Sequence, residues 1–362
     1  MKSSIINRLL VTLALACSLC HTVAATTTKR AKLIFAADLI RHGNRSPVHP
    51  LLGSGKIHWS SPAGYLLPSG KQQHLALGRQ QGLFYLKEGL IPINCQNCIQ
   101  VRSSDFERTR MSAQTFLLGF FSARPDSLPT PPIHSVPKAD DRLLLQTDQP
   151  AFQQQIAKRM GSELTDPWLI ANQERFSAIA GYPIKNRLDF IAFADAITVR
   201  QAADKPMPSQ LNPAEIRRIR ANFDRLYTKR LADKQLAQQA AQGILDAIFK
   251  QFIDYQAGKS PVRYLLLSGH DDNLLAVLNT VAKIQHQQPP LASVVSFQFY
   301  QLESNFQLRI LYNHRMVRQL SLHASDRESR ILSDLAGKKQ HDKPHTLNDR
   351  QLASNKSSSV TT

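Results

Sequence analysis

The chain has 362 residues, 42% of them hydrophobic and 20% charged, and its formal net charge is +18. This length is enough for one large α/β domain, alone or with a smaller inserted domain. The basic surface favours anions such as phosphate esters. The sequence has no recognisable nucleic-acid-binding motif, so we expect no nucleic-acid partner.

The first 25 residues have the pattern of a signal peptide. Lys2 and Arg8 give a positive start, an uncharged apolar run follows, and the stretch from Val23 to Ala25 is a small-residue cleavage site. The apolar run is short for a membrane span, which needs about 20 apolar residues. An uncleaved anchor and a lipoprotein site at Cys17 are the alternatives. We therefore expect export to the periplasm or the exterior, no transmembrane segment, and a mature chain of charge +16.

The segment after the leader alternates short apolar runs with helical patterns. In chain order the patterns predict a strand over 32–40, a helix over 69–87, a strand over 99–102, a helix from Asp105 to about Phe121 and a short strand over 133–136. Proline, glycine and serine dominate 48–68, which is expected to be irregular.

The second half changes character. Residues 149–258 are rich in Gln, Ala, Leu, Arg and Lys, which favours helix. A strand over 263–268, a helix from about 274 to 281 and a hairpin over 294–300 and 308–312 follow. The pattern predicts an α/β fold: a central, mostly parallel sheet flanked by helices, formed by 26–148 and 259–332. Residues 149–258 form an inserted, smaller all-α cap, and 333–362 a disordered basic tail.

Two cysteines, Cys95 and Cys98, remain after the leader. In an oxidising compartment this spacing is typical of a local disulfide. Half of a zinc site and a redox motif are the alternatives, although no nearby histidine pair completes a zinc site. We expect no metal and no cofactor.

The run Arg41-His42-Gly43-Asn44-Arg45-Ser46-Pro47 directly follows the first predicted strand. In open α/β sheets, ligands bind beyond the carboxyl ends of the strands. Two arginine forks match phosphate oxygens, Gly43 lets the backbone approach an anion closely, and the imidazole of His42 can attack phosphorus. A lone Arg-His-Gly would fit a surface turn equally well, but the whole string after a strand predicts an anion-binding catalytic loop.

Two arginines accompany the second predicted strand. Arg102 ends this strand, and the start of the next helix offers backbone N–H groups and a positive dipole. Arg102 is therefore a candidate phosphate ligand. Arg108, inside the predicted helix, has the pattern of a solvated helix charge or an outer support.

His270 and Asp271 stand where the later strand gives way to a helix. A carboxylic acid there can protonate a leaving alkoxide, and His270 can donate to a phosphate oxygen. Asp271 alone would also suit a helix N-cap. Asp272 and Asn273 are expected to be caps or orienting residues.

Together these motifs resemble the histidine acid phosphatase family, branch 2 of the histidine phosphatase superfamily. The resemblance runs from about Lys32 to Tyr312 and rests on four motifs: Arg41-His-Gly-x-Arg-x-Pro47, Gly70-x-x-Gln73-His74, Arg102-Ser-Ser-Asp-Phe-Glu-Arg-Thr109 and Gly269-His-Asp-x-Asn273. It implies that His42 is the nucleophile, that Asp271 is the proton donor, and that the phosphate is bound by Arg41, Arg45, Arg102 and His270.

The chain departs from many relatives at two points. Asp272 replaces a common Thr or Ser, and most of the family's disulfide cysteines are missing. Neither change removes a reacting group.

The resemblance thus implies a secreted acid phosphatase that hydrolyses phosphomonoesters through a phosphohistidine. Asp271 must start protonated and its ordinary pKa is about 3.9, so we expect an acidic optimum. Broad specificity, a phytase-like preference and a homodimer are all compatible with the sequence. A cytosolic mutase and a non-enzymatic anion-binding protein are the weaker alternatives.

Overall fold

The computed structural model describes residues 31–92, 95, 97–122, 130–282, 285–323, 325–326 and 328–335. The expected signal peptide lies outside these residues. Within them, no helix combines the length and the apolar character needed to cross a membrane.

The described strands form one sheet of seven, in the order β3-β2-β4-β1-β5-β6-β7. Their bounds are β1 Lys32–Arg41, β2 Ile99–Ser103, β3 Ile133–His134, β4 Tyr264–Gly269, β5 Val294–Leu302, β6 Asn305–Tyr312 and β7 Arg315–His323. The first four of these in sheet order pair in parallel, while β5, β6 and β7 form an antiparallel meander beside β1. The predicted α/β class is confirmed, and the expected hairpin gains a third strand, β7.

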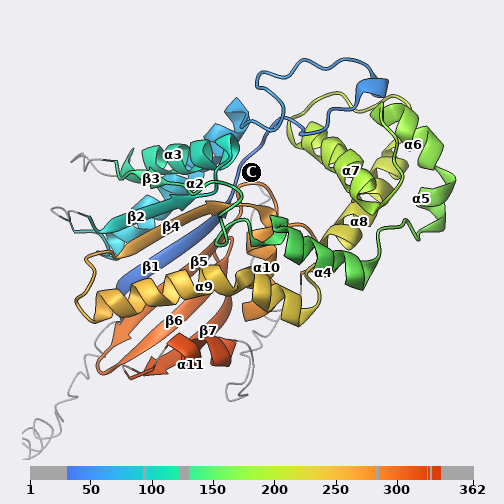
Figure 1. Cartoon of the computed structure of the whole chain (residues 1–362). Helices are drawn as coiled ribbons and strands as arrows, with labels where there is room; N and C mark the ends of the chain where they lie inside the picture. Colours follow the sequence, from blue (N-terminus) through green and yellow to red (C-terminus); the bar gives the residue numbers. More distant parts are fainter. Residues whose placement is uncertain are drawn as a thin grey trace, which may run out of the picture.

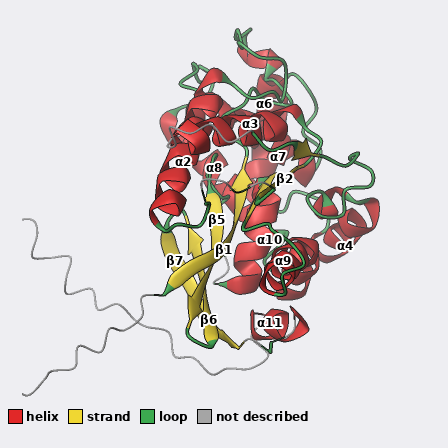
Figure 2. Cartoon of the chain, turned by 90° about the vertical axis from the view of Figure 1, so that its left-hand side faces the viewer, coloured by secondary structure: helices red, strands yellow, loops and turns green. Residues whose placement is uncertain are grey.

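Helices cover both faces of this sheet (Figure 2). On one side lie α2 Pro68–Lys87 and α3 Glu107–Ser122, and on the other α9 Lys234–Gln256, α10 Asp271–Val281 and α11 Glu328–Leu335. In β4 successive side chains alternate between two hydrophobic clusters, as a strand buried on both faces requires. Tyr264 and Leu266 face α2 and α3, whereas Leu265 and Leu267 face the opposite layer.

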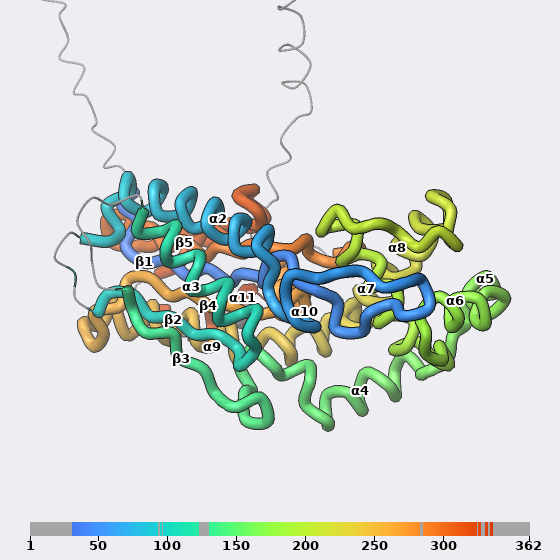
Figure 3. Tube along the Cα trace, turned by 90° about the horizontal axis from the view of Figure 1, so that it is seen from above, coloured from blue at the N-terminus to red at the C-terminus, as the bar shows by residue number. Residues whose placement is uncertain are grey.

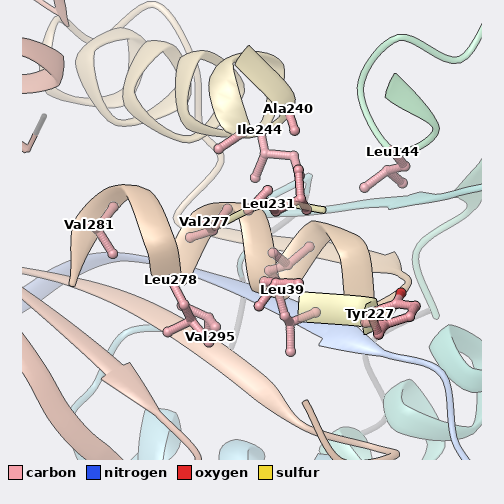
Figure 4. Packing of buried hydrophobic residues seen from close by; sticks show 14 of the residues in the cluster. Leu39, Leu144, Tyr227, Leu231, Ala240, Ile244, Val277, Leu278, Val281 and Val295 are labelled. Atoms are coloured by element: carbon pink, nitrogen blue, oxygen red, sulfur yellow. The ribbon is translucent and has the colours of Figure 1, made fainter. Parts of the chain in front are cut away.

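The larger cluster has α10 at its centre. Val277, Leu278 and Val281 of this helix pack among Leu39 of β1, Val295 of β5 and Ile244 of α9, as Figure 4 shows. This packing fixes the first turn of α10 above the ends of β1 and β4.

The cap projects from one side of the core (Figures 1 and 3). It consists of α4 Pro150–Met160, α5 Pro167–Ala171, α6 Gln173–Ala180, α7 Arg187–Ala202 and α8 Pro213–Lys229. The expected cap ran to residue 258, but α9 lies along the sheet instead. Phe252 of α9 stacks on Phe299 of β5 with ring centroids 4.1 Å apart, which places α9 in the core layer.

Two smaller expectations meet the structure in part. The polar tail was placed from 333, yet α11 runs to Leu335, whose side chain is buried; 336–362 lie outside the described residues. The sulfurs of Cys95 and Cys98 lie within bonding distance, as a local disulfide requires.

Candidate active site

The site is assembled where three parallel strands end. The register pairs Arg41 of β1 with Gly269 of β4, and Ser103 of β2 with Ser268 of β4. The segments that follow β1, β2 and β4 therefore leave the same edge of the sheet side by side. The next residues are His42, Ser104 and His270, and the rings of the two histidines lie 5.6 Å apart between centroids.

The loop after β1 is seated on the start of α2. A Cβ on Gly43 would lie 2.6 Å from the carbonyl oxygen of Gly70, so neither glycine tolerates a side chain at this approach. The backbone N–H of Asn44 donates to Gln73 Oε1 at 2.8 Å, and the N–H of Gly43 donates to Ser112 Oγ at 3.2 Å. The Gly-x-x-Gln segment thus holds the histidine loop in place.

His42 is buried and electrostatically neutral. Its Nδ1 lies 2.9 Å from the carbonyl oxygen of Gly43, which can only accept, so Nδ1 carries the proton and Nε2 keeps its lone pair. Burial, and then the positive charges of Arg108, Arg41 and Arg45, hold the pKa of His42 well below 6.5.

His270 precedes α10 and is fixed from two directions. Its Nε2 lies 2.9 Å from Ser104 Oγ, and its backbone N–H donates to Asn273 Oδ1 at 2.8 Å. Asn273 in turn donates to the carbonyl of Leu144 at 2.9 Å. Asn273 is therefore the orienting residue that the sequence predicts.

Asp271 is the first residue of α10 rather than its N-cap. Its Oδ2 pairs with Arg41 Nη2 at 2.9 Å and accepts from Gln288. Burial alone would raise the pKa of Asp271, but Arg41, the nearby hydroxyl of Tyr227 and His270 outweigh it and lower the pKa to about 2. In the unliganded pocket Asp271 is therefore a carboxylate.

The other arginine of the loop reaches the cap. Arg45 Nη2 lies 2.9 Å from both carboxylate oxygens of Asp195 in α7. Arg45 is largely buried. This pair joins the loop after β1 to the cap.

Arg102 and Arg108 occupy positions opposite to those expected. Arg102 Nη2 pairs with the fully buried Asp141 at 3.0 Å, and its Nη1 donates to the carbonyls of Ser103 and His134. Arg108, in the first turn of α3, makes no ion pair among the described residues. Burial, and then Arg45, lower its pKa to about 10, so it remains cationic at neutral and acid pH. The structure thus brings Arg108, not Arg102, to the site.

A hollow of about 140 Å³ opens beside these groups. Its lining residues are Arg108, Leu144, Leu145, Thr147, Asp148, His270, Asp271 and Asp272. Arg108 and His270 contribute cationic and donor side chains to this lining, and Leu144, Leu145, Thr147 and Asp148 belong to the connection that leads from β3 into the cap.

Asp272, the unusual residue after the His-Asp pair, joins the core to the cap. It accepts from Tyr227 Oη at 2.6 Å and Thr147 Oγ1 at 3.3 Å, and it forms an ion pair with Arg230 just after α8. Its role is thus an anchor for neighbouring elements.

A family model, the histidine phosphatase superfamily (branch 2), matches residues 32–313. The chain belongs to this family. Testicular acid phosphatase of Homo sapiens is 27% identical over 293 residues, covering 74% of this chain and 67% of the relative. Lysosomal acid phosphatase of Bos taurus is 27% identical over 318 residues, covering 79% and 72%. These relatives confirm the expected enzyme class, a phosphoric monoester hydrolase.

The fold of this histidine phosphatase is also that of solved structures. The phytase of Klebsiella sp ASR1 superposes with a TM-score of 0.62 at 17% identity, covering 86% of this chain and 96% of the phytase. At this identity the likeness supports the shared fold alone.

Proposed function

We propose that this chain is an exported acid phosphatase that hydrolyses phosphomonoesters through a phosphohistidine on His42. The observation that carries the proposal is the state of His42. It is a neutral imidazole, its Nδ1 is tied to Gly43, and the charges of Arg41, Arg45 and Arg108 surround it. Such a group combines a free Nε2 lone pair with an environment that attracts a phosphate dianion.

The phosphate is held by arginines and His270. Arg41 and Arg45 come from the loop after β1, and Arg108 from the first turn of α3 takes the place predicted for Arg102. Each guanidinium offers a planar fork that fits phosphate oxygens. Phosphoryl transfer depends mainly on such positioning and charge neutralisation.

The chemistry takes two steps. Nε2 of His42 bonds to phosphorus while the ester oxygen leaves with the proton of Asp271. Water then attacks the phosphohistidine, returns a proton to the Asp271 carboxylate and frees His42 and inorganic phosphate. Arg41 neutralises charge at both steps.

Asp271 gains its proton when substrate binds. With a pKa of about 2 in the free pocket, Asp271 is ionised and paired with Arg41. An incoming phosphate competes for Arg41 and adds negative charge beside the carboxylate. Both effects raise the pKa of Asp271, which makes it a proton donor in the complex.

Both His42 and Asp271 favour catalysis in acid solution. The pKa of His42 lies well below 6.5, so the nucleophile stays unprotonated in mildly acid solution. Lower pH also favours the protonated form of Asp271. An acidic optimum is therefore the proposed working range.

The N-terminal pattern supports export to the periplasm or the exterior. Broad specificity is the proposed range of substrates, with a phytase-like restriction as the alternative. A homodimer is compatible with the family.

A phosphoenzyme-trapping experiment tests the nucleophile. The protein is mixed with ³²P-labelled aryl phosphate at acid pH, quenched and analysed for acid-labile, base-stable label. We expect label on the parent and on His58→Ala, which removes an exposed histidine, but none on His42→Ala. Hydrolysis by His42→Ala should fall about 10⁴-fold or more. Phosphate release by His42→Ala at the parental rate would show the assignment to be wrong.

A further inference from the structure

Asp148 shares a hollow with the proposed proton donor. Leu144, Leu145, Thr147 and Asp148 line this hollow together with Arg108 and His270. In the proposed reaction Asp271 protonates the leaving oxygen, and Asp271 lines the same hollow. The rest of the leaving group therefore enters this hollow, which Asp148 also lines.

The negative charges that line the hollow are incompletely balanced. Asp272 is paired with Arg230, and Asp271 with Arg41. Asp148, the last residue of the turn Gln146–Asp148, lines the hollow and keeps part of its surface open to solvent. Among the described residues, no hydrogen bond or ion pair engages its carboxylate. Asp148 is thus the carboxylate of this lining without a neutralising partner.

We propose that Asp148 determines which leaving groups the enzyme accepts by their charge. This inference rests on the proposed phosphatase function. Its carboxylate favours monoesters whose leaving group bears an ammonium group and disfavours those with a second phosphate close to the reacting one. Where Asp148 is ionised, the preferred substrate class is therefore amino-alcohol or neutral phosphomonoesters rather than densely phosphorylated polyols.

The charge of Asp148 depends on its surroundings. Burial, and then Asp272, raise its pKa to about 6, while Arg230 and Arg108 act in the opposite direction and Asp271 raises it further. Above about pH 6 Asp148 is ionised and selects by charge. Below that value it becomes neutral, so the selection fades as the solution becomes more acid.

The test compares kcat/KM for glycerol 2-phosphate, phosphoethanolamine and inositol hexakisphosphate at pH 7 and pH 5. Variants are Asp148→Asn, which keeps the shape, and Asp148→Lys, which reverses the charge. Asp140→Asn is the matched control, because Asp140 is an exposed aspartate on the same connection outside the hollow.

At pH 7 we expect Asp148→Asn to raise the ratio of hexakisphosphate to glycerol 2-phosphate about tenfold, equivalent to about 1.4 kcal/mol. The ratio of phosphoethanolamine to glycerol 2-phosphate should fall severalfold. Asp148→Lys should change both ratios by more than Asp148→Asn does, and Asp140→Asn should change neither ratio. At pH 5 the parent and Asp148→Asn should converge.

Unchanged ratios at pH 7 would overturn the inference. Equal changes at pH 5 and pH 7 would also do so, because they would point to shape rather than charge, and so would an equal effect of Asp140→Asn. Failure of the parent to hydrolyse any of the three esters would instead overturn the proposed function, and this inference with it.

Discussion

Replacing Arg108 by alanine tests the revised phosphate site most directly. Arg108 lines the hollow and has no ion pair among the described residues, so its guanidinium is available to the phosphate. Two hydrogen bonds from a charged fork contribute about 1.5–3 kcal/mol each. Allowing for partial replacement by water, we expect kcat/KM of Arg108→Ala to fall about 10²–10³-fold. Arg108→Lys should recover part of this loss, since it restores charge but not the fork.

The matched variant is Arg102→Ala. Removing Arg102 leaves Asp141, which is 1% exposed, as a buried carboxylate without its cation. Breaking a buried pair in this way costs about 3–5 kcal/mol. Asp141 still accepts from the N–H groups of Leu143 and Leu144, so we expect the lower end of that range. In the folded protein kcat/KM should change less than about threefold, which is far below the effect at Arg108.

The assay pairs kcat/KM for p-nitrophenyl phosphate with the free energy of unfolding in urea, for each variant at one pH. A large activity loss with near-parental stability is expected for Arg108→Ala, and the reverse for Arg102→Ala. The reasoning is refuted if Arg102→Ala loses activity by 10²-fold while Arg108→Ala keeps it.

Three further variants test the same contacts. Asp271→Asn should slow hydrolysis of alkyl esters more than that of aryl esters with good leaving groups, measured as the ratio of kcat/KM; equal slowing would exclude the acid role. The pKa of Asp271 lies near 2, below its ordinary value, so its pair with Arg41 stabilises the fold above about pH 4 and ceases to do so as pH falls toward 2. The free energy of unfolding of Asp271→Asn should therefore lack this loss of stability between about pH 4 and pH 2. Asp272→Ala should lose about 3 kcal/mol in urea unfolding, because Arg230 is left buried and unpaired; parental stability would contradict this. Asp195→Asn should raise KM for aryl phosphates severalfold with a smaller change in kcat, since Asp195 positions a binding arginine; an unchanged KM would argue against that role.

The sequence predicts the site well wherever a motif directly follows a parallel strand. His42 and His270 come immediately after β1 and β4, and the register of these strands leaves them one residue above the sheet. Strand length and the turn residues near Gly43 and Gly269 are local properties. Local patterns therefore suffice to bring His42, Arg41 and Asp271 together.

The sequence pattern does not predict which arginine faces the site, because that depends on the direction of the side chain. Arg102 lies one residue before the end of β2 and turns toward Asp141, which is distant in sequence. Arg108 lies six positions later, in the first turn of α3, where a helix start favours an anion. The position of Arg108 at a helix start could have indicated an anion ligand. A single arginine on a helix, however, has the same sequence pattern whether it binds an anion or faces solvent.

Tertiary packing also decides the extent of the cap. By composition α9 matches the helices before it, so the sequence alone cannot separate it from the cap. Phe249 and Phe252 nevertheless place it on the sheet, against Phe299. Asp148 belongs to no motif, and what singles it out is its place in the hollow and a carboxylate without an ion pair among the described residues.

Two ion pairs hold the cap against the core. Asp272 pairs with Arg230 at the end of α8, and Arg45 pairs with Asp195 in α7. Both ion pairs join cap and core, and Asp272 also lines the hollow. Asp272 is thereby both an anchor for the cap and part of the hollow wall. A change at Asp272 that loosens the cap therefore also changes the hollow, so stability and specificity are linked at this residue.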